Sequence, residues 1–339
     1  MKRVTMIPFS EYMQSWLYGP EGYYARFKAI GKEGDFFTAV SASPFFGAVI
    51  AHYMIDLIKK GKLSPRLSLV EIGAHQGYLM ADMISWIAQE APELLETIDW
   101  VIVERFEGLK RVQKRYLQDR FGDAITLRHV TDPRQIGAKE AFVVANEIFD
   151  AFACDLVFKG KTALVDEKTH TIHFEGEDPQ VLALAKKYGR QKGEVARGYE
   201  SFAEALFEGI DKGVFVSFDY GEKEIRTDFS IRIYKGHEVF PLFEEGLDLS
   251  RYFGRSDLTY DVHFGHVIDA FEGAGFTLGA YKTQLRALTE MGLPDLLQQL
   301  AAYGDQKLYM RELNKIKTLI DPQMMGERFK MVEFHKNMR

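Results

Sequence analysis

The stretch Arg66–Leu79, RLSLVEIGAHQGYL, decides the fold of this chain. Its first half is a short apolar run that contains a single acid, Glu71, and such runs are typical of buried parallel strands. Gly73 and Gly77 follow, and they allow the backbone to turn tightly into a helix predicted to begin near Tyr78. A strand, a glycine turn and a helix in this order indicate a nucleotide-binding α/β fold.

The spacing of the glycines decides which nucleotide is expected. A dinucleotide fingerprint requires G-x-G-x-x-G, and His75 and Tyr78 stand at its second and third glycine positions, so NAD is disfavoured. Glu71, two residues before the first glycine, suits a ligand with an ammonium group, and S-adenosylmethionine carries one beside its sulfonium. Glu104, which ends the run Trp100–Glu104, can accept hydrogen bonds from both ribose hydroxyls. Together these features predict S-adenosylmethionine as the cofactor.

Further apolar runs recur at helix-length intervals. The strand candidates after the opening run are Trp100–Glu104, Ile125–Val130, Ala141–Asn146 and Val214–Asp219. Near the end of the chain, Phe276–Thr283 and Phe329–His335 are predicted to pair as an antiparallel couple. We therefore expect an α/β fold, with a Rossmann-like seven-stranded methyltransferase sheet and helices on both faces.

Two long intervals and the N-terminus interrupt this pattern. Residues 155–213 exceed a single crossover and are predicted to form an inserted lobe. That lobe contains two strand-like runs and a predicted helix, namely Leu156–Phe158, Thr171–Phe174 and Pro179–Tyr188. Residues 232–264 are rich in glycine, aspartate and aromatics, which favours a second insertion made of ordered loops. Residues 1–40 are aromatic-rich and are predicted to form a lid on a domain that spans residues 41–339.

Polar residues follow the predicted strands, where ligands bind in open α/β sheets. These strand-end residues are Glu71, Gly73, Glu104, Asp132, Asn146, Glu147 and Asp219. The fourth strand end faces the transferred methyl group in this fold, so Asn146 and Glu147 are predicted to hold a guanidinium acceptor. Asp150 would join them if the following turn is helical. The alternative is that Glu147 and Asp150 only cap the next helix.

Six motifs occur in the order found in MidA-like methyltransferases: Gly22–Tyr24, Gly34–Thr38, Leu69–Gly73, Ala145–Ala151, Asp219–Gly221 and Asp257–Thr259. The chain resembles this family from about residue 19 to residue 264, and the family includes a mitochondrial complex I assembly methyltransferase. The resemblance implies methyl transfer from S-adenosylmethionine to a protein, with arginine as the favoured acceptor. It also implies a link to the assembly of respiratory complex I. A small-molecule acceptor is the alternative.

The resemblance and the strand ends together assign roles to individual residues. The predicted cofactor-binding residues are Asp35, Thr38, Glu71, Gly73, Gly77, Glu104, Asp132 and Asn146. The predicted catalytic residues are Asn146, Glu147, Asp150 and His237, and the acceptor pocket is assigned to Asp219, Tyr220, Asp257 and Thr259. For Thr38 the alternative is an N-cap, which Thr38 or Ser41 would provide before a helix at Pro44.

Two departures from the family pattern motivate a rival hypothesis. The family turn usually reads glycine, proline, glycine, with another glycine two residues later, whereas His75 stands at the middle glycine position here. If His75 needs a positive φ, its Cβ costs on the order of 1 kcal/mol and crowds the cofactor. After Asp-Leu-Thr, Asp261 and His263 occur in the reverse of the family order. The rival hypothesis is a catalytically silent binding or assembly factor.

Composition limits the partners and the metal chemistry. The net charge of −6 disfavours nucleic acid, and the basic stretch Arg105–Arg120 is predicted to be a solvated helix face. Cys154 is the single cysteine, which excludes an internal disulfide and a multi-thiolate zinc site. The histidines and acids of residues 237–266 match no ligand spacing, so no metal is expected. The expected partner is a protein substrate, and the oligomeric state is not fixed by the sequence.

The longest apolar stretch bears on membrane insertion and location. Pro44–Ile58 contains His52 and Asp56 and is shorter than the ~20 residues of a membrane span. It is therefore predicted to be a buried helix. The N-terminal residues do not form a signal-type apolar core. We expect no membrane insertion, no export and a cytoplasmic location.

Overall fold

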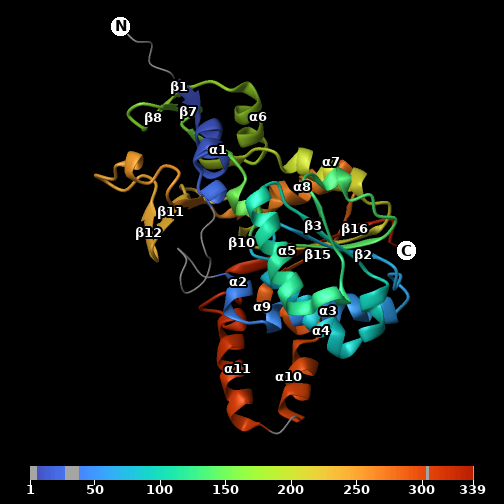
Figure 1. Cartoon of the computed structure of the whole chain (residues 1–339). Coiled ribbons are helices and arrows are strands. Elements are labelled where there is room, and N and C mark those ends of the chain that lie inside the picture. Colours follow the sequence, from blue (N-terminus) through green and yellow to red (C-terminus); the bar gives the residue numbers. More distant parts are fainter. Residues whose placement is uncertain (1–5, 27–37, 303–304, 339) are drawn as a thin grey trace. The chain divides into compact units, whose positions relative to one another are not determined.

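The computed structural model describes residues 6–26, 38–302 and 305–338. The residue contacts divide the chain into two compact units. Unit 1 comprises the described residues of Met1–Phe36, Phe149–Glu200 and Gly221–Val267, and unit 2 those of Phe37–Ile148, Ser201–Tyr220 and Ile268–Arg339. Each unit therefore joins segments that are distant in the sequence (Figure 1).

Unit 2 is built on a mostly parallel sheet. In spatial order its strands are β15 (Thr277–Thr283), β16 (Phe329–Lys336), β10 (Gly213–Glu222), β5 (Ala141–Asn146), β2 (Ser68–Ile72), β3 (Asp99–Val103) and β4 (Leu127–Val130). The five strands from β10 to β4 run parallel, whereas β16 is antiparallel to both of its neighbours. The predicted α/β fold and its terminal antiparallel pair are confirmed. A short eighth strand, β14 (Val262–His263), pairs with the last two residues of β10.

The strand bounds agree closely with the hydrophobic pattern. β5 has the predicted ends, and β3 begins one residue before the predicted Trp100. All five residues of β2 are buried, as expected for a strand in the middle of a parallel sheet. Because β2 lies between β3 and β5, the polar residues that follow these strands are brought to one edge of the sheet.

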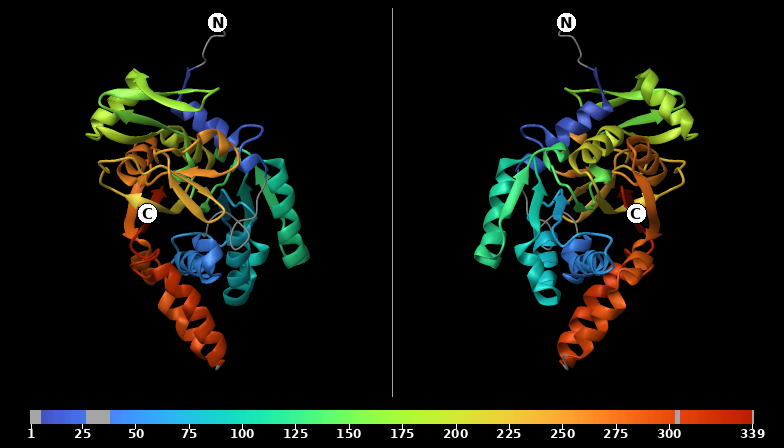
Figure 2. Two further views of the ribbon diagram at one scale, coloured as in Figure 1. Left: turned by 90° about the vertical axis from the view of Figure 1, so that its left-hand side faces the viewer. Right: turned by 90° about the vertical axis from the view of Figure 1, so that its right-hand side faces the viewer.

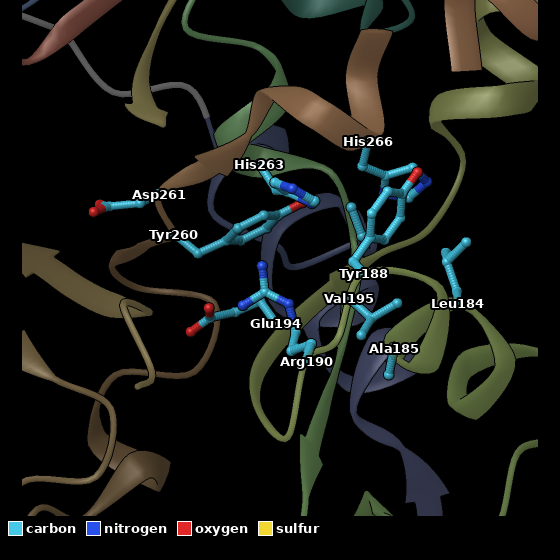
Figure 3. A pocket seen from close by; sticks show the side chains of 11 residues that line it. Leu184, Ala185, Tyr188, Arg190, Glu194, Val195, Tyr260, Asp261, His263 and His266 are labelled. Atoms are coloured by element: carbon cyan, nitrogen blue, oxygen red, sulfur yellow. The ribbon is translucent and has the colours of Figure 1, made fainter. Parts of the chain in front are cut away.

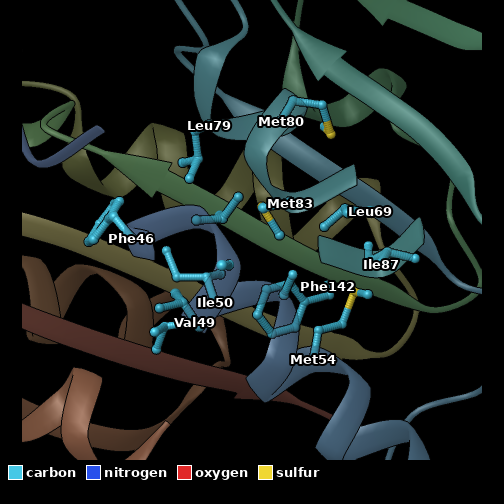
Figure 4. Packing of buried hydrophobic residues seen from close by; sticks show 14 of the residues in the cluster. Phe46, Val49, Ile50, Met54, Leu69, Leu79, Met80, Met83, Ile87 and Phe142 are labelled. Carbon is cyan, nitrogen blue, oxygen red and sulfur yellow. The ribbon is translucent and has the colours of Figure 1, made fainter. Parts of the chain in front are cut away.

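The core of unit 2 lies between the sheet and two helices, α3 (Phe45–Lys59) and α4 (Tyr78–Glu90). Figure 4 shows their side chains packed against the strands. The labelled residues are Phe46, Val49, Ile50 and Met54 of α3, Leu79, Met80, Met83 and Ile87 of α4, and Leu69 and Phe142 of the sheet. Each fully buried side chain of this kind stabilises the fold by ~1.5–3 kcal/mol. The buried helix predicted at Pro44–Ile58 is confirmed.

Further helices complete unit 2. They are α2 (Ala39–Ala42), η2 (Pro92–Glu96), α5 (Glu107–Phe121), η3 (Gly122–Ala124), η4 (Pro133–Gln135), most of α7 (Tyr199–Gly209) and α8 (Phe264–Ala274), α9 (Gln284–Glu290), α10 (Leu293–Ala302) and α11 (Gln306–Ile320). Figure 2 shows α10 and α11 side by side. In the part of the chain that the structure describes, no helix is both long enough and apolar enough to cross a bilayer.

Unit 1 contains two antiparallel sheets. The larger is formed by β1 (Met6–Pro8), β7 (Lys161–Asp166), β6 (Cys154–Phe158) and β9 (Lys192–Ala196), with β8 (Thr171–Gly176) on the other side of β7. Helices α1 (Phe9–Tyr18) and α6 (Pro179–Lys187) belong to the same unit. The predicted strands at β6 and β8 and the helix at α6 are present. β7 and β9 were not predicted. Each pairs with a strand that is distant in the sequence, β7 with β1 and β9 with β6, and such pairing exists only in the folded chain.

The second insertion is a sheet rather than a set of loops. β11 (Arg232–Lys235) lies between β12 (Glu238–Pro241) and β13 (Asp257–Thr259), and η6 (Leu249–Arg251) precedes β13. The segment is ordered, as expected, but it contains three short strands where loops were expected. These strands are only three or four residues long, so their hydrophobic pattern was too short to identify.

Candidate active site

The glycine turn after β2 requires left-handed backbone at three positions. Gly73 has φ +73°, His75 has φ +45°, and Gly77 has φ +83° and directly precedes α4. A Cβ at Gly73 would lie 2.8 Å from Cγ2 of Ile148, so the turn has no room for a side chain there. The open first turn of α4 presents backbone N–H groups beside this turn. The strained φ anticipated for His75 is therefore present.

Glu71 is held beneath the first turn of α4. Its Oε2 atom accepts a hydrogen bond of 3.0 Å from the backbone N–H of Met80, and only 3% of the residue is exposed. Burial raises the pKa of Glu71 to about 8, and the hydrogen bond from Met80 partly opposes this rise. Glu71 is therefore mostly protonated near neutral pH in the protein alone. Its assignment to the cofactor ammonium stays a prediction.

Glu104 is fixed by a network that the sequence did not reveal. Its Oε1 accepts from the N–H of Phe106 at 2.9 Å, and its Oε2 accepts from Nε2 of Gln113 at 3.2 Å. The same Nε2 donates to the carbonyl oxygen of His75 at 2.8 Å, and Oε1 of Gln113 lies 2.9 Å from Nε2 of His129. Gln113 therefore links the acid after β3 to the glycine turn. Burial raises the pKa of Glu104, while these donors oppose the rise.

Gln113 could have been found from its position in the helix. It lies four residues after Leu109 and four before Leu117, and these three residues form the buried stripe of α5. A fully buried amide between two leucines requires hydrogen-bond partners. The remaining face of α5 is mostly exposed, as predicted for residues 105–120.

The end of β5 holds a strained acid and an unpaired oxygen. Glu147 has φ +53°, and its N–H donates to the carbonyl oxygen of Phe218 at 2.8 Å. Its Oε1 accepts from Nδ2 of Asn146 at 2.9 Å and from the N–H of Ala39 at 3.4 Å. Oδ1 of Asn146 is buried and has no partner among the described residues. This oxygen is the atom of the site best suited to accept a hydrogen bond from a ligand.

Two predicted cofactor residues serve as helix caps. Thr38 accepts from the N–H of Ser41 at 3.2 Å and forms a capping box before α2. It is therefore an N-cap, but of α2 and not of the helix expected at Pro44, whose N-cap is Pro44 itself. Asp132 accepts from the N–H of Arg134 at 2.9 Å and caps η4. One oxygen of the Asp132 carboxylate is thus engaged by the turn that follows it, and the assignment of Asp132 to the cofactor stays a prediction. Asp35 lies outside the described residues.

Asp219 and Tyr220 lie in β10 and are both buried. Asp219 is completely buried, and its Oδ1 accepts from the N–H of Tyr220 at 2.9 Å. The guanidinium carbon of Arg328 lies 5.5 Å from the centre of the Tyr220 ring. Tyr220 is thus positioned against a cation, and the assignment of both residues to an acceptor pocket stays a prediction.

Unit 1 contains three other predicted site residues, Asp150, Asp257 and Thr259. Tyr24 donates to both oxygens of Asp257, at 3.0 and 3.2 Å, and the N–H of Tyr260 donates to the carbonyl oxygen of Asp150 at 3.2 Å. Thr259, also buried, lies on β13 with Asp257. Burial raises the pKa of Tyr24, and the charges of Asp257 and Asp150 raise it further. Two buried carboxylates therefore act on the same tyrosine.

Two expectations about this region were wrong. The segment after Asn146 does not form a helix that Glu147 and Asp150 could cap, because Glu147 adopts a positive φ and only the single 3₁₀ turn η5 (Phe149–Ala151) follows. His237 does not line a pocket with Asp257. It is exposed, with φ +67°, in the two-residue turn between β11 and β12, a geometry typical of hairpin turns.

The comparison with protein families now decides the class of the protein. The model of a family described as "Putative S-adenosyl-L-methionine-dependent methyltransferase" matches residues 49–281. The chain belongs to this family. The predicted cofactor, the enzyme class and the family resemblance are confirmed by this match.

Known relatives of this methyltransferase agree with the match. The zebrafish (Danio rerio) protein named "Protein arginine methyltransferase NDUFAF7, mitochondrial" is 27% identical over 357 residues, which cover 95% of this chain and 82% of the relative. The human (Homo sapiens) protein of the same name is 25% identical over 362 residues, which cover 97% of this chain and 80% of the relative.

A solved structure shows the same fold. A Burkholderia thailandensis protein bound to S-adenosyl-homocysteine aligns with a TM-score of 0.83 and 24% identity, over 98% of this chain and 89% of that one. The comparisons also correct one expectation. A cytoplasmic location is contradicted, because the zebrafish, rat, mouse, human and bovine relatives are all named as mitochondrial proteins.

Proposed function

We propose that this methyltransferase transfers the methyl group of S-adenosylmethionine to an arginine side chain of a protein. The observation that carries the proposal is the pair at the end of β5, where the buried Oδ1 of Asn146 lacks a partner beside the carboxylate of Glu147. A guanidinium presents planar N–H donors, and an amide oxygen next to a carboxylate matches them in geometry and charge. The names of the relatives, protein arginine methyltransferases, support the same acceptor.

The residues around β2 and β3 fit the cofactor. Gly73 and Gly77 place no side chain at two positions of the turn, and the Gln113 network holds His75 and Glu104 in fixed positions. In this proposal Glu71 interacts with the ammonium group of the cofactor and Glu104 with the ribose. The bound cofactor supplies an electrophilic methyl group on its sulfonium. The protein then contributes alignment and an anionic environment. The guanidinium nitrogen that is methylated must lose a proton, and the carboxylate of Glu147 beside Asn146 is the group proposed to accept it.

Within unit 1, Asp150 and Asp257 form an anionic environment around Tyr24 that is suited to a cationic group. Both are buried, and their charges act together on Tyr24. An arginine side chain that approaches these acids would gain a Coulombic attraction that a neutral acceptor lacks. The acceptor protein, and the link to complex I assembly that the family resemblance implies, remain predictions.

Glu147→Gln tests the proposal. We expect turnover to fall on the order of a hundredfold, because a charge that favours the cationic transition state is lost. Affinity for S-adenosylmethionine should be unchanged, because Glu147 is not assigned to the cofactor. The matched control is Glu96→Gln, which makes the same change at an exposed position of η2 in the same unit.

Two measurements separate the outcomes. Transfer of labelled methyl to mitochondrial protein extract, followed by mapping of the modified residue, reports the acceptor. Isothermal titration with S-adenosylmethionine reports cofactor affinity. Full activity of Glu147→Gln, or label on a residue other than arginine, would remove the proposed roles. Failure of the folded wild-type protein to bind the cofactor would favour the silent assembly factor.

A further inference from the structure

Unit 1 contains a small pocket that none of the assigned roles explains. It is lined by Leu184, Ala185, Tyr188, Arg190, Glu194, Val195, Ala196, Tyr260, Asp261, His263 and His266 (Figure 3). The pocket is narrow and partly open to solvent, and the free space between its side chains is about the size of one water molecule. An occupant must therefore be a small ion or the end group of a larger molecule.

Arg190 is the unusual residue of this pocket. Only 9% of it is exposed, and its side chain points into the pocket (Figure 3). Its backbone N–H donates to the carbonyl oxygen of Ala185 at 2.8 Å, which fixes the residue just beyond α6. The guanidinium forms no hydrogen bond or ion pair with any residue that the structure describes. A guanidinium has five N–H donors, and leaving them unpaired in a buried site is costly.

The guanidinium is packed closely against the backbone of β9. A Cβ at Gly193 would collide with Nη1 of Arg190, and Gly193 has φ +132°, which other residues rarely adopt. The absence of a side chain at this position gives the guanidinium its space. The backbone conformation of β9 thus helps to fix the position of the guanidinium.

The acids near Arg190 are engaged by other groups. Glu194 acts on Arg190 electrostatically, but its carboxylate accepts from the N–H groups of Ser230 and Ile231, at 2.7 and 2.9 Å, and from the hydroxyl of Ser230 at 3.1 Å. Asp261 is paired with two arginines of the same unit, Arg226 and Arg232. Arg190 is therefore a buried cation whose donors are not used by the neighbouring carboxylates.

The remaining walls combine aromatic rings with the aliphatic side chains of Leu184, Ala185, Val195 and Ala196. His263 packs edge-on against Tyr188, with ring centres 4.7 Å apart, and His266 is bound to Glu200 at 2.7 Å. The hydroxyl of Tyr260 lies 3.2 Å from that of Tyr199. Apolar ring faces exclude water and strengthen a hydrogen bond from the guanidinium to an anion.

We propose that this pocket binds a small oxyanion, a carboxylate or a phosphate, through the guanidinium of Arg190. The planar fork of donors matches two oxygens of such a group in bidentate geometry. All lining residues belong to unit 1, whereas Glu71, Gly73, Gly77 and Glu104, which are proposed to hold the cofactor, belong to unit 2. The pocket therefore shares none of these cofactor residues.

Isothermal titration of the full chain at constant ionic strength tests the proposal. Inorganic phosphate and acetate are titrated separately, so that the two sources of oxyanion are distinguished. We expect at least one of them to bind the wild-type protein, and Arg190→Gln to lose about tenfold or more of that affinity. The matched control is Arg251→Gln, which removes the same charge from an exposed residue paired locally with Asp248. The control should bind as the wild type does.

A second measurement does not depend on the folding of a variant. Wild-type crystals are soaked in selenate, whose anomalous signal reports a bound tetrahedral oxyanion, or in acetate. Density for either ion beside Arg190 would support the proposal. Absence of both ions from this pocket and absence of binding in solution would overturn it, as would a folded Arg190→Gln variant that binds with wild-type affinity.

Discussion

Cofactor binding should release a proton from Glu71. In the protein alone the pKa of this carboxyl is about 8, so at pH 7 about nine molecules in ten carry the proton. An ammonium group placed against the carboxyl favours its ionised form. If the cofactor ammonium occupies this position, binding at pH 7 should release about 0.9 proton, and the cofactor Kd should fall almost tenfold between pH 6 and pH 7.

Glu71→Gln should abolish this linkage while keeping the fold, because the amide oxygen of glutamine can still accept from the N–H of Met80. At pH 7, ionising Glu71 costs the wild-type protein ~1.4 kcal/mol of binding free energy, whereas a charged hydrogen bond to the cofactor contributes ~1.5–3 kcal/mol. The variant should therefore bind up to about tenfold more weakly at pH 7, with a Kd that does not change between pH 6 and pH 7.

Isothermal titration in phosphate and in Tris measures the released protons, because the two buffers differ in their enthalpy of ionisation. Glu90→Gln, at the last residue of α4 and paired at the surface with Lys59, is the matched control and should behave as the wild type. Equal proton release by the wild type and by Glu71→Gln would refute the assignment. Glu71 would then be a buried acid that only supports the first turn of α4.

Three further outcomes follow from the same contacts. The first concerns the free energy of unfolding in urea: the part linked to Glu71 should be fully present below its unfolded pKa of about 4.5 and lost as pH rises toward 8. Over that pH range Glu71→Gln should therefore become more stable relative to the wild type. Gln113→Leu should destabilise the fold by about 1–3 kcal/mol, because the carbonyl of His75 and the carboxylate of Glu104 lose a donor. Cofactor affinity should fall as well, and unchanged affinity would show that the network does not support the site. His75→Gly should stabilise the fold by about 0.5–1 kcal/mol, because glycine adopts a positive φ without strain. The control His173→Gly, within β8, should destabilise the fold. A loss of stability in His75→Gly would show that the histidine side chain contributes more than the strain costs.

The local hydrophobic pattern of the sequence was sufficient to predict the main strands of the unit 2 sheet. The apolar run before Gly73 identified β2, and the equivalent run at Ala141–Asn146 identified β5 with its observed bounds. The terminal pair β15 and β16 was also predicted, because long alternating or apolar segments are the strongest signal of a strand. Parallel strands bring their carboxyl ends to one edge, so the list of acids at that edge followed from the sequence.

The inserted segments show where local pattern fails. β7 pairs with both β1 and β6, so strands from the N-terminus and from the first insertion form one sheet. Pairing over more than 150 residues leaves no signature in either segment alone. His237 and Asp257 were grouped because they are both polar and lie in one insertion, yet the hairpin turn exposes His237 and the β13 strand buries Asp257.

The sequence by itself determined that this protein has a nucleotide-binding α/β sheet and that acids stand at the ends of its strands, because strand formation and turn geometry depend on near neighbours. Only the tertiary structure decided which of these acids is available to a ligand. Glu71 is engaged by a helix nine residues away and Glu104 by a buried glutamine on another helix. The proton affinity and hydrogen-bond capacity of a carboxyl depend on burial and on its partners, and packing sets both.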